Sequence, residues 1–211
     1  MKTIIFFYLG ALLWVINAID AIPPTTAYIQ PAEYSFIQDT GFISLFNGKD
    51  FTGWGFLNKT QEGIIFESLE GCTESKDKRF VVNEGLLTAN SYKEGNEVRY
   101  LNLWTEKEFP KDFLLNLEFR ASKDADSGIF LRGKQLQCRN YRVLGPYKDL
   151  KKYKEQDWNK IEVVVKNNIA HCTCNGEVLE EAMMIPSTGR IGLESDRGQM
   201  EYRNIRLEEL E

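Results

Sequence analysis

The stretch DFLLNLEFRASKDADSGIFLRG, residues 112–133, decides the fold class of this chain. Apolar and polar side chains alternate through residues 115–120, which is the period of a strand with one buried face and one polar face. After the polar turn at residues 123–128, alternation resumes with Ile129 and Leu131 on one side. We therefore predict two strands joined as a hairpin, with Glu118, Arg120 and Arg132 on one polar face. That face is either a solvated outer surface or the floor of a polar cleft.

Segments with the same alternation recur along the chain and are separated by turn sequences such as Asn-Gly. Helical periodicity is nearly absent. Many short strands with tight turns predict an all-β protein, with an antiparallel β-sandwich or barrel as its architecture. The expected strands outside the central stretch are residues 42–46, 63–67, 79–82, 86–88, 99–105, 135–139, 158–166, 169–174, 177–179, 189–194 and 200–207.

The composition excludes some classes of partner. Apolar residues make up 43% of the 211-residue chain and charged residues 27%, as in a soluble globular protein with a sizeable core. The net charge is −5, without a long basic run. Nucleic acids and anionic membrane surfaces both require a positive patch, so neither is an expected partner.

The N-terminus predicts export. Lys2 precedes an apolar segment at residues 4–16, which is too short to span a bilayer comfortably, and small residues follow at Ala18 and Ala21. We read residues 1–21 as a signal peptide, residues 22–40 as an N-terminal arm and residues 41–211 as one domain. The mature protein is then periplasmic or extracellular, with no transmembrane segment once the signal is removed. An uncleaved N-terminal anchor is the alternative.

Four cysteines remain in the predicted mature chain: Cys72, Cys138, Cys172 and Cys174. An oxidising compartment permits disulfides, and four cysteines allow three pairings among which the sequence does not choose. Buried free thiols are the alternative. Zinc is disfavoured, because the Cys-x-Cys spacing has no second pair and His171 is the only histidine.

Several motifs, taken in order, resemble the 3-keto-disaccharide hydrolase family. Each is weak alone, but their order is specific, and the resemblance covers about residues 41–210. The motifs are FISLFNGKDFTGW at residues 42–54, FLLNLEFR at 113–120, DSGIFLRG at 126–133, WN at 158–159, CNG at 174–176, GRIGL at 189–193 and EYRNI at 201–205.

The resemblance implies a concanavalin A-like jelly roll that binds its ligand on a concave sheet. It also implies an enzyme that hydrolyses glycosidic bonds of 3-keto-disaccharides, with carbohydrate as the partner. The chain departs from the family pattern twice. Asp126 stands where the family usually has asparagine, and the family's Glu-x-Gln strand aligns with either Gln135 or Gln137 in place of its glutamate.

The implied reaction needs a base to remove the C2 proton beside the keto group, donors or a metal for the enolate oxygen, and an acid for the leaving group. The expected catalytic residues are Glu118 as base or metal ligand, with Arg120 and Arg132 as donors. No cofactor can be named from the sequence, and a divalent metal stays open. The expected substrate-binding residues are Asn116, Gln137, Trp104, Glu194, Asp196 and Arg197.

Other readings of these residues remain open. Paired Arg and Glu side chains on a sheet are often structural salt bridges of little energetic value, and aromatic residues in a sandwich often belong to the core. A lectin-like carbohydrate-binding module without catalysis is the alternative function. A surface interaction domain without a sugar ligand is the third.

Overall fold

A computed structural model describes residues 41–91, 100–143 and 145–211. These residues form β-strands and turns and contain no helix, which confirms the all-β prediction. Within the same ranges no helix is therefore long and apolar enough to cross a membrane. The expected signal peptide at residues 1–21 and arm at residues 22–40 lie outside the described residues.

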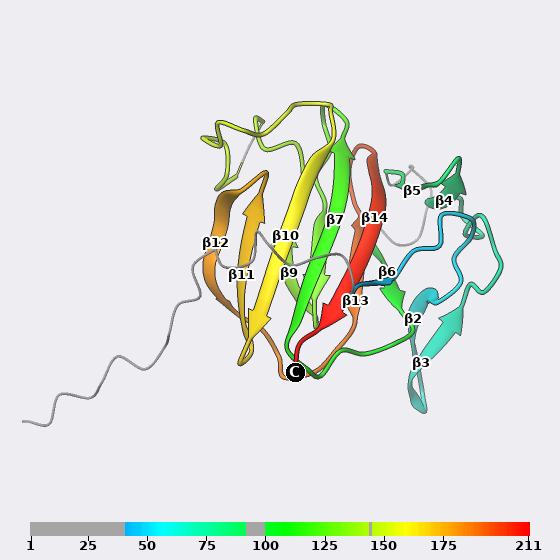
Figure 1. The fold of residues 1–211 in the computed structure, drawn as a ribbon. Helices are drawn as coiled ribbons and strands as arrows, with labels where there is room; N and C mark the ends of the chain where they lie inside the picture. The colour runs from blue at the N-terminus through cyan, green and yellow to red at the C-terminus, as the bar shows by residue number, and fades with distance from the viewer. Residues whose placement is uncertain (1–40, 92–99, 144) are drawn as a thin grey trace, which may run out of the picture. The chain divides into compact units, whose positions relative to one another are not determined.

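The larger of the two sheets has eight antiparallel strands, in the order β12-β11-β10-β7-β14-β5-β4, with β1 also paired to β14 (Figure 1). The central strand β7 pairs with β10 on one side and with β14 on the other. The bounds are β1 Ile43–Ser44, β4 Phe80–Asn83, β5 Leu86–Ala89, β7 Phe113–Ala121, β10 Asn159–Lys166, β11 Ile169–Cys174, β12 Glu177–Met184 and β14 Met200–Glu209.

The second sheet has six antiparallel strands, in the order β3-β2-β6-β13-β8-β9. The two sheets face each other as a jelly-roll β-sandwich, as predicted. The bounds are β2 Trp54–Thr60, β3 Gly63–Ser68, β6 Leu101–Thr105, β8 Gly128–Leu131, β9 Lys134–Gln137 and β13 Ile191–Ser195.

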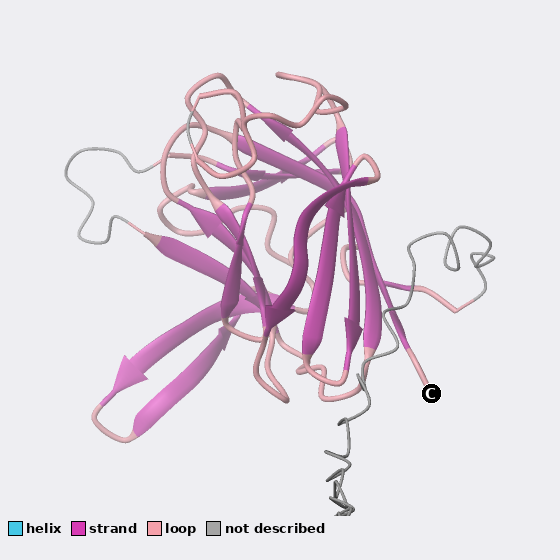
Figure 2. Cartoon of the chain, turned by 90° about the vertical axis from the view of Figure 1, so that its left-hand side faces the viewer, coloured by secondary structure: helices cyan, strands magenta, loops and turns pink. Residues whose placement is uncertain are grey.

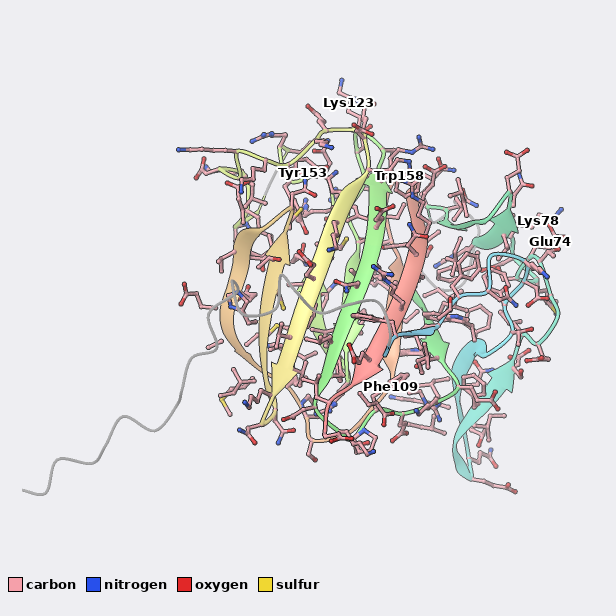
Figure 3. All side chains as sticks on the ribbon, in the orientation of Figure 1. Glu74, Lys78, Phe109, Lys123, Tyr153 and Trp158 are labelled. Atoms are coloured by element: carbon pink, nitrogen blue, oxygen red, sulfur yellow. The ribbon has the colours of Figure 1, made fainter. Side chains whose placement is uncertain are left out.

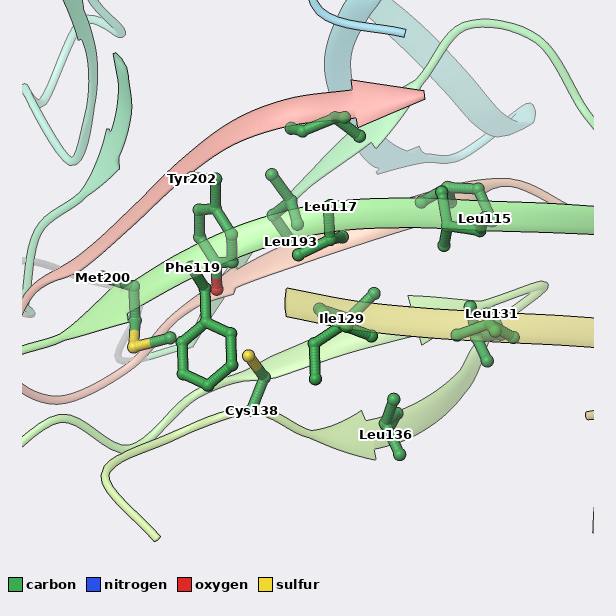
Figure 4. Close-up of a cluster of buried hydrophobic side chains, with 14 of the residues drawn as sticks. Leu115, Leu117, Phe119, Ile129, Leu131, Leu136, Cys138, Leu193, Met200 and Tyr202 are labelled. Atoms are coloured by element: carbon green, nitrogen blue, oxygen red, sulfur yellow. The ribbon is translucent and has the colours of Figure 1, made fainter. Parts of the chain in front are cut away.

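The core lies between the sheets and is built from the inward side of each alternating strand. Leu115 and Phe119 from β7 lie near Ile129 and Leu131 from β8, with Leu193 from β13 alongside (Figure 4). All five side chains are inaccessible to solvent. Burial of one such side chain stabilises the fold by roughly 1.5–3 kcal/mol, so this contact between sheets is a major source of stability.

The predicted hairpin between the two central strands is wrong. β7 belongs to the eight-stranded sheet, whereas β8 pairs with β13 and β9 in the six-stranded sheet. The turn at residues 122–127 crosses from one sheet to the other, because both strands have an apolar side and the two sides pack against each other. Their polar sides consequently point in opposite directions. The expectation that Arg132 shares a face with Glu118 and Arg120 is therefore also wrong.

The four cysteines are free thiols in the structure, with Cys138, Cys172 and Cys174 buried and Cys72 exposed. Burial raises the pKa of Cys174 to about 12, with a further contribution from the nearby Glu177. A thiol with so high a pKa is almost entirely protonated at neutral pH and is a poor nucleophile. The three buried cysteines thus act as apolar core residues.

Candidate functional site

The outer side of the six-stranded sheet is set by the alternation of β13. Ile191 and Leu193 point into the core, so Gly192 and Glu194 between and beyond them point outward. Gly192 lies opposite Trp104 of β6 and Phe130 of β8, and Glu194 lies opposite Asn102. We call the outer surface formed by Asn102, Trp104, Phe130, Gln135 and Glu194 the Glu194 face.

Two aromatic rings form a platform on the Glu194 face. The ring centroids of Trp104 and Phe130 are 5.3 Å apart, with an interplanar angle of 52°. Gly192 lies between their strands, and a Cβ atom there would lie 2.7 Å from the indole ring. The glycine therefore leaves room for the Trp104 ring over the sheet, and the two tilted rings present an apolar surface suited to the apolar face of a sugar ring.

Glu194 is the carboxylate beside this platform. It is 9% exposed, and its Oε2 accepts a hydrogen bond of 2.7 Å from Nε2 of Gln135. Burial, followed by the nearby charges of Asp196 and Asp126, raises the pKa of Glu194 to about 7, against an ordinary value of 4.5. A carboxyl group with a pKa near neutrality can accept and release a proton under physiological conditions, as a general base requires.

Asp126 holds two arginines at the edge of the Glu194 face. Its carboxylate pairs with Nη1 of Arg139 at 3.1 Å and with Nη2 of Arg197. Its backbone also forms an isolated bridge with Arg197. Arg139 donates from the same Nη1 to the side-chain oxygen of Gln137 at 3.3 Å. These contacts fix a charged rim next to Glu194.

Two buried polar atoms near Glu194 have no hydrogen-bond partner among the described residues: Oδ1 of Asn102 and Nε of Arg139. Asn102 lies directly opposite Glu194 in the sheet. Buried polar atoms are rarely left unsatisfied, because each one costs about 1–3 kcal/mol. Both atoms are inaccessible to solvent, so a polar ligand on the Glu194 face would reach them only after the two side chains move.

The outer side of the eight-stranded sheet carries a second polar surface. Glu118 accepts hydrogen bonds from Nε of Arg203 at 2.5 Å and from Nδ2 of Asn204 at 3.1 Å. The guanidinium groups of Arg120 and Arg203 lie 4.9 and 3.9 Å from the ring centroid of Trp158, which Figure 3 labels. We call this surface the Glu118 face.

A pocket of about 390 Å³ lies on the Glu118 face, and Asn116 and Glu118 are both among its lining residues. Arg120 does not line it and is instead paired with Glu201. Glu118 and Arg120 each form a salt bridge with a residue of the neighbouring strand β14. Such structural pairs are the alternative to a catalytic role that the sequence left open.

Arg132 lies on neither face. The residue is 3% exposed. Its guanidinium donates hydrogen bonds to the carbonyl oxygens of Phe109 at 2.6 Å and Pro186 at 3.1 Å. It also donates to the carbonyl oxygen of Lys111 and to Oδ1 of Asn168. The hydrogen bonds of Arg132 therefore connect separate loops. We assign it a structural role, in place of the catalytic role expected from the sequence.

The expected site residues thus divide between two opposite surfaces of the sandwich. Gln137, Trp104, Glu194, Asp196 and Arg197 belong to the Glu194 face or its rim. Asn116, Glu118 and Arg120 belong to the Glu118 face. The sequence interpretation missed the roles of Phe130, Gln135, Asp126 and Arg139 at the Glu194 face, although the alternation of β8 already pointed Phe130 away from the core.

The described residues contain no group of three or more His, Cys, Asp or Glu side chains arranged to hold a metal ion. No cofactor is named from the sequence, and the question of a divalent metal is left to experiment.

Comparison with known proteins gives one family match. The 3-keto-alpha-glucoside-1,2-lyase-like domain matches residues 41–208, close to the extent of the resemblance in the sequence motifs. No curated protein matches the chain.

Two solved structures from Parabacteroides distasonis ATCC 8503, each described as a "putative glycosyl hydrolase", share the fold. The first has a TM-score of 0.59 at 17% sequence identity and covers 81% of this chain and 95% of its own. The second has a TM-score of 0.51, also at 17% identity, and covers 65% and 93%. At this identity the likeness establishes the fold.

Proposed function

Because the chain belongs to the 3-keto-alpha-glucoside-1,2-lyase-like domain family, we propose that it cleaves 3-keto-glycosides, with Glu194 as the base. The observation that carries this assignment is the raised pKa of Glu194, to about 7, beside an aromatic platform on an outer sheet face. Glu118, the base expected from the sequence, is instead held by Arg203 and Asn204. The Glu194 face therefore has the stronger claim.

The chemistry follows from the keto group. A carbonyl at C3 makes the hydrogen on C2 acidic. The carboxylate of Glu194 takes that proton, and the C–H electrons form the enolate. The enolate then re-forms the ketone, a double bond forms between C1 and C2, and the bond between C1 and the glycosidic oxygen breaks. The leaving oxygen takes a proton from solvent, and addition of water across the double bond completes hydrolysis.

The polar groups around Glu194 suit the substrate. Gln137 supplies an amide donor for sugar and enolate oxygens, and the guanidinium of Arg139, held by Asp126, adds a positive charge beside it. Trp104 and Phe130 supply the apolar surface. Whichever of Gln135 and Gln137 replaces the glutamate that the resemblance implies, this face keeps a carboxylate, because Glu194 lies there in contact with Gln135.

The test is an incubation of the purified protein with 3-keto-trehalose and with trehalose, with and without EDTA, followed by detection of released 3-keto-glucose and glucose. We expect release from the keto sugar alone. Glu194→Gln should lower kcat/KM by about 10²–10⁴-fold, the usual contribution of a general base. EDTA sensitivity would add a metal to the site.

The matched variant is Glu118→Gln, which makes the same chemical change on the opposite face. Loss of turnover in Glu118→Gln, with turnover retained in Glu194→Gln, would move the site to the Glu118 face. Binding of the sugar without release of product would replace the enzyme with a lectin-like module.

A further inference from the structure

The Glu194 face continues beyond Trp104 onto the β2–β3 ribbon, whose outer side carries the apolar residues Leu57, Ile64 and Phe66. We propose that this ribbon is a subsite for a flat, apolar aglycone, so that the preferred substrates are 3-keto-glycosides of aromatic alcohols. The inference rests on the proposed function for the chemistry at the sugar, and it adds the class of leaving group.

The register of the strands makes the surface continuous. Gly55 of β2 pairs with Trp104 on one side and with Ser68 of β3 on the other. A Cβ atom at Gly55 would lie 2.7 Å from Cζ of Phe66. The ring of Phe66 therefore extends over Gly55 toward the strand of Trp104, much as the Trp104 ring extends over Gly192.

The ring of Phe66 is held in position by Arg190. The guanidinium of Arg190 lies 4.9 Å from its centroid, at cation–π distance. Nη1 of Arg190 donates to the carbonyl oxygen of Thr105 at 2.9 Å and also to that of Glu106. A ring fixed in this way offers an apolar contact to a ligand without the entropic cost of ordering the ring.

Two more apolar side chains share a side with Phe66, between Ser68 next to Gly55 and Lys59 at the far end of the ribbon. Leu57 lies opposite Phe66 in the ribbon, and Ile64 is two residues from Phe66 on the same side. Leu57 is 36% exposed and Ile64 is 65% exposed. The other side of the ribbon carries Ile65 together with a hydrogen bond of 2.5 Å between Asn58 and Glu67. A second sugar would need a row of hydroxyl-binding groups, whereas Leu57, Ile64 and Phe66 offer an adjoining set of hydrocarbon contacts.

The dimensions fit one sugar plus an aglycone. Three strand spacings separate β13, which carries Glu194, from β3. At about 4.8 Å per spacing, the surface from Glu194 to the ribbon spans about 14 Å. Figure 2 shows the ribbon extending from the body of the domain, on the side away from the eight-stranded sheet. An aglycone attached at C1 of a sugar at Glu194 can therefore lie along it.

The test compares two keto sugars that differ only in what leaves C1: the 3-keto form of 2-naphthyl glucoside and 3-keto-trehalose. The double variant Leu57→Ser, Ile64→Ser should lower kcat/KM for the naphthyl substrate by about tenfold, as expected when apolar contacts in a pocket are lost. Turnover of 3-keto-trehalose should stay within about twofold. An equal loss for both substrates would overturn the subsite.

The matched control is Ile65→Ser, because Ile65 is 53% exposed on the opposite side of the same strand. This variant should leave both substrates unaffected. If Ile65→Ser reproduces the selective loss, the effect comes from the stability of the ribbon and the subsite is wrong.

A binding measurement separates this inference from the proposed function. Unoxidised 2-naphthyl glucoside has no keto group, so its affinity, measured by calorimetry, needs no chemistry. Suppose that the double variant binds this glucoside more weakly than the natural protein and the Ile65→Ser variant do, and that none of the three proteins cleaves a keto sugar. The aglycone subsite would then be supported and the proposed lyase activity would be rejected. A second copy of the chain could cover this surface in place of an aglycone, and light scattering at the assay concentration tests for it. If the natural protein is a dimer and the double variant is a monomer, the surface serves self-association and the subsite is wrong.

Discussion

Nε2 of Gln135 donates a hydrogen bond of 2.7 Å to Oε2 of Glu194, although the two residues lie on strands that do not pair with each other. β8 lies between them, and the side chain of Gln135 crosses it at Gly128. A Cβ atom at Gly128 would lie 2.4 Å from Nε2 of Gln135. The glycine thus makes room for the bond, which holds one carboxylate oxygen of Glu194 in a fixed place.

The pH dependence of turnover should report the ionisation of Glu194. A base works only when deprotonated, and its pKa of about 7 lies well above the ordinary value. We therefore expect kcat/KM for 3-keto-trehalose to rise with pH and level off above about pH 7. A pH–rate profile from pH 5 to 9 checks this. A rate already level by pH 5 would show that another group is the base.

Replacing Gln135 should move that profile. The hydrogen bond from Gln135 stabilises the ionised carboxylate and lowers the pKa of Glu194 from the value that burial alone would give. Gln135→Met removes the donor at similar side-chain length, so the acidic limb of the profile should shift to higher pH. An unshifted profile would mean that the bond does not persist in solution.

Glu194 should also make stability depend on pH. Its folded-state pKa exceeds its unfolded value, so the folded state binds the proton more tightly and the free energy of unfolding falls as pH rises from about 4.5 to above 7. The loss is at most about 3 kcal/mol, at 1.36 kcal/mol per pKa unit.

The Glu194→Gln variant lacks this ionisation. Urea unfolding at pH 5 and pH 8 should therefore show the variant gaining stability relative to the natural protein at the higher pH. A difference between the two proteins that is the same at both pH values would contradict the raised pKa.

Arg132 should matter for stability. Arg132→Met would leave carbonyl oxygens of Phe109, Lys111 and Pro186 without their donor, at a cost of about 3–5 kcal/mol in the free energy of unfolding. Urea unfolding measures the change. Lys134→Met, at an exposed position on β9, is the control and should change stability little. Equal effects of the two substitutions would show that the buried bonds of Arg132 contribute little.

The fold class could be predicted from the sequence because its signals are local. The alternation through residues 115–120 identifies a strand with one buried face, whichever sheet that strand joins. The pairing of β7 with β8 could not be predicted in the same way. Two neighbouring strands with apolar sides can lie edge to edge in one sheet or face to face across the core, and both arrangements satisfy the same alternation.

The division of the site has the same cause. Alternation shows that Glu118 and Glu194 both point away from the core, as the sequence interpretation concluded. It does not show on which of the two outer faces each one lies, because that depends on which sheet each strand joins. The raised pKa of Glu194 also has no local signal, since burial and the charges of Asp126 and Asp196 come from tertiary structure.

Asp126 belongs to the crossing between β7 and β8, and its carboxylate holds Arg139 and Arg197 at the rim of the Glu194 face. The segment that joins the two layers of the sandwich is therefore also a wall of the proposed catalytic centre. Separation of the layers would displace that wall at once. Catalytic competence and the sandwich itself should consequently disappear in a single cooperative transition as denaturant is added, without an inactive folded intermediate.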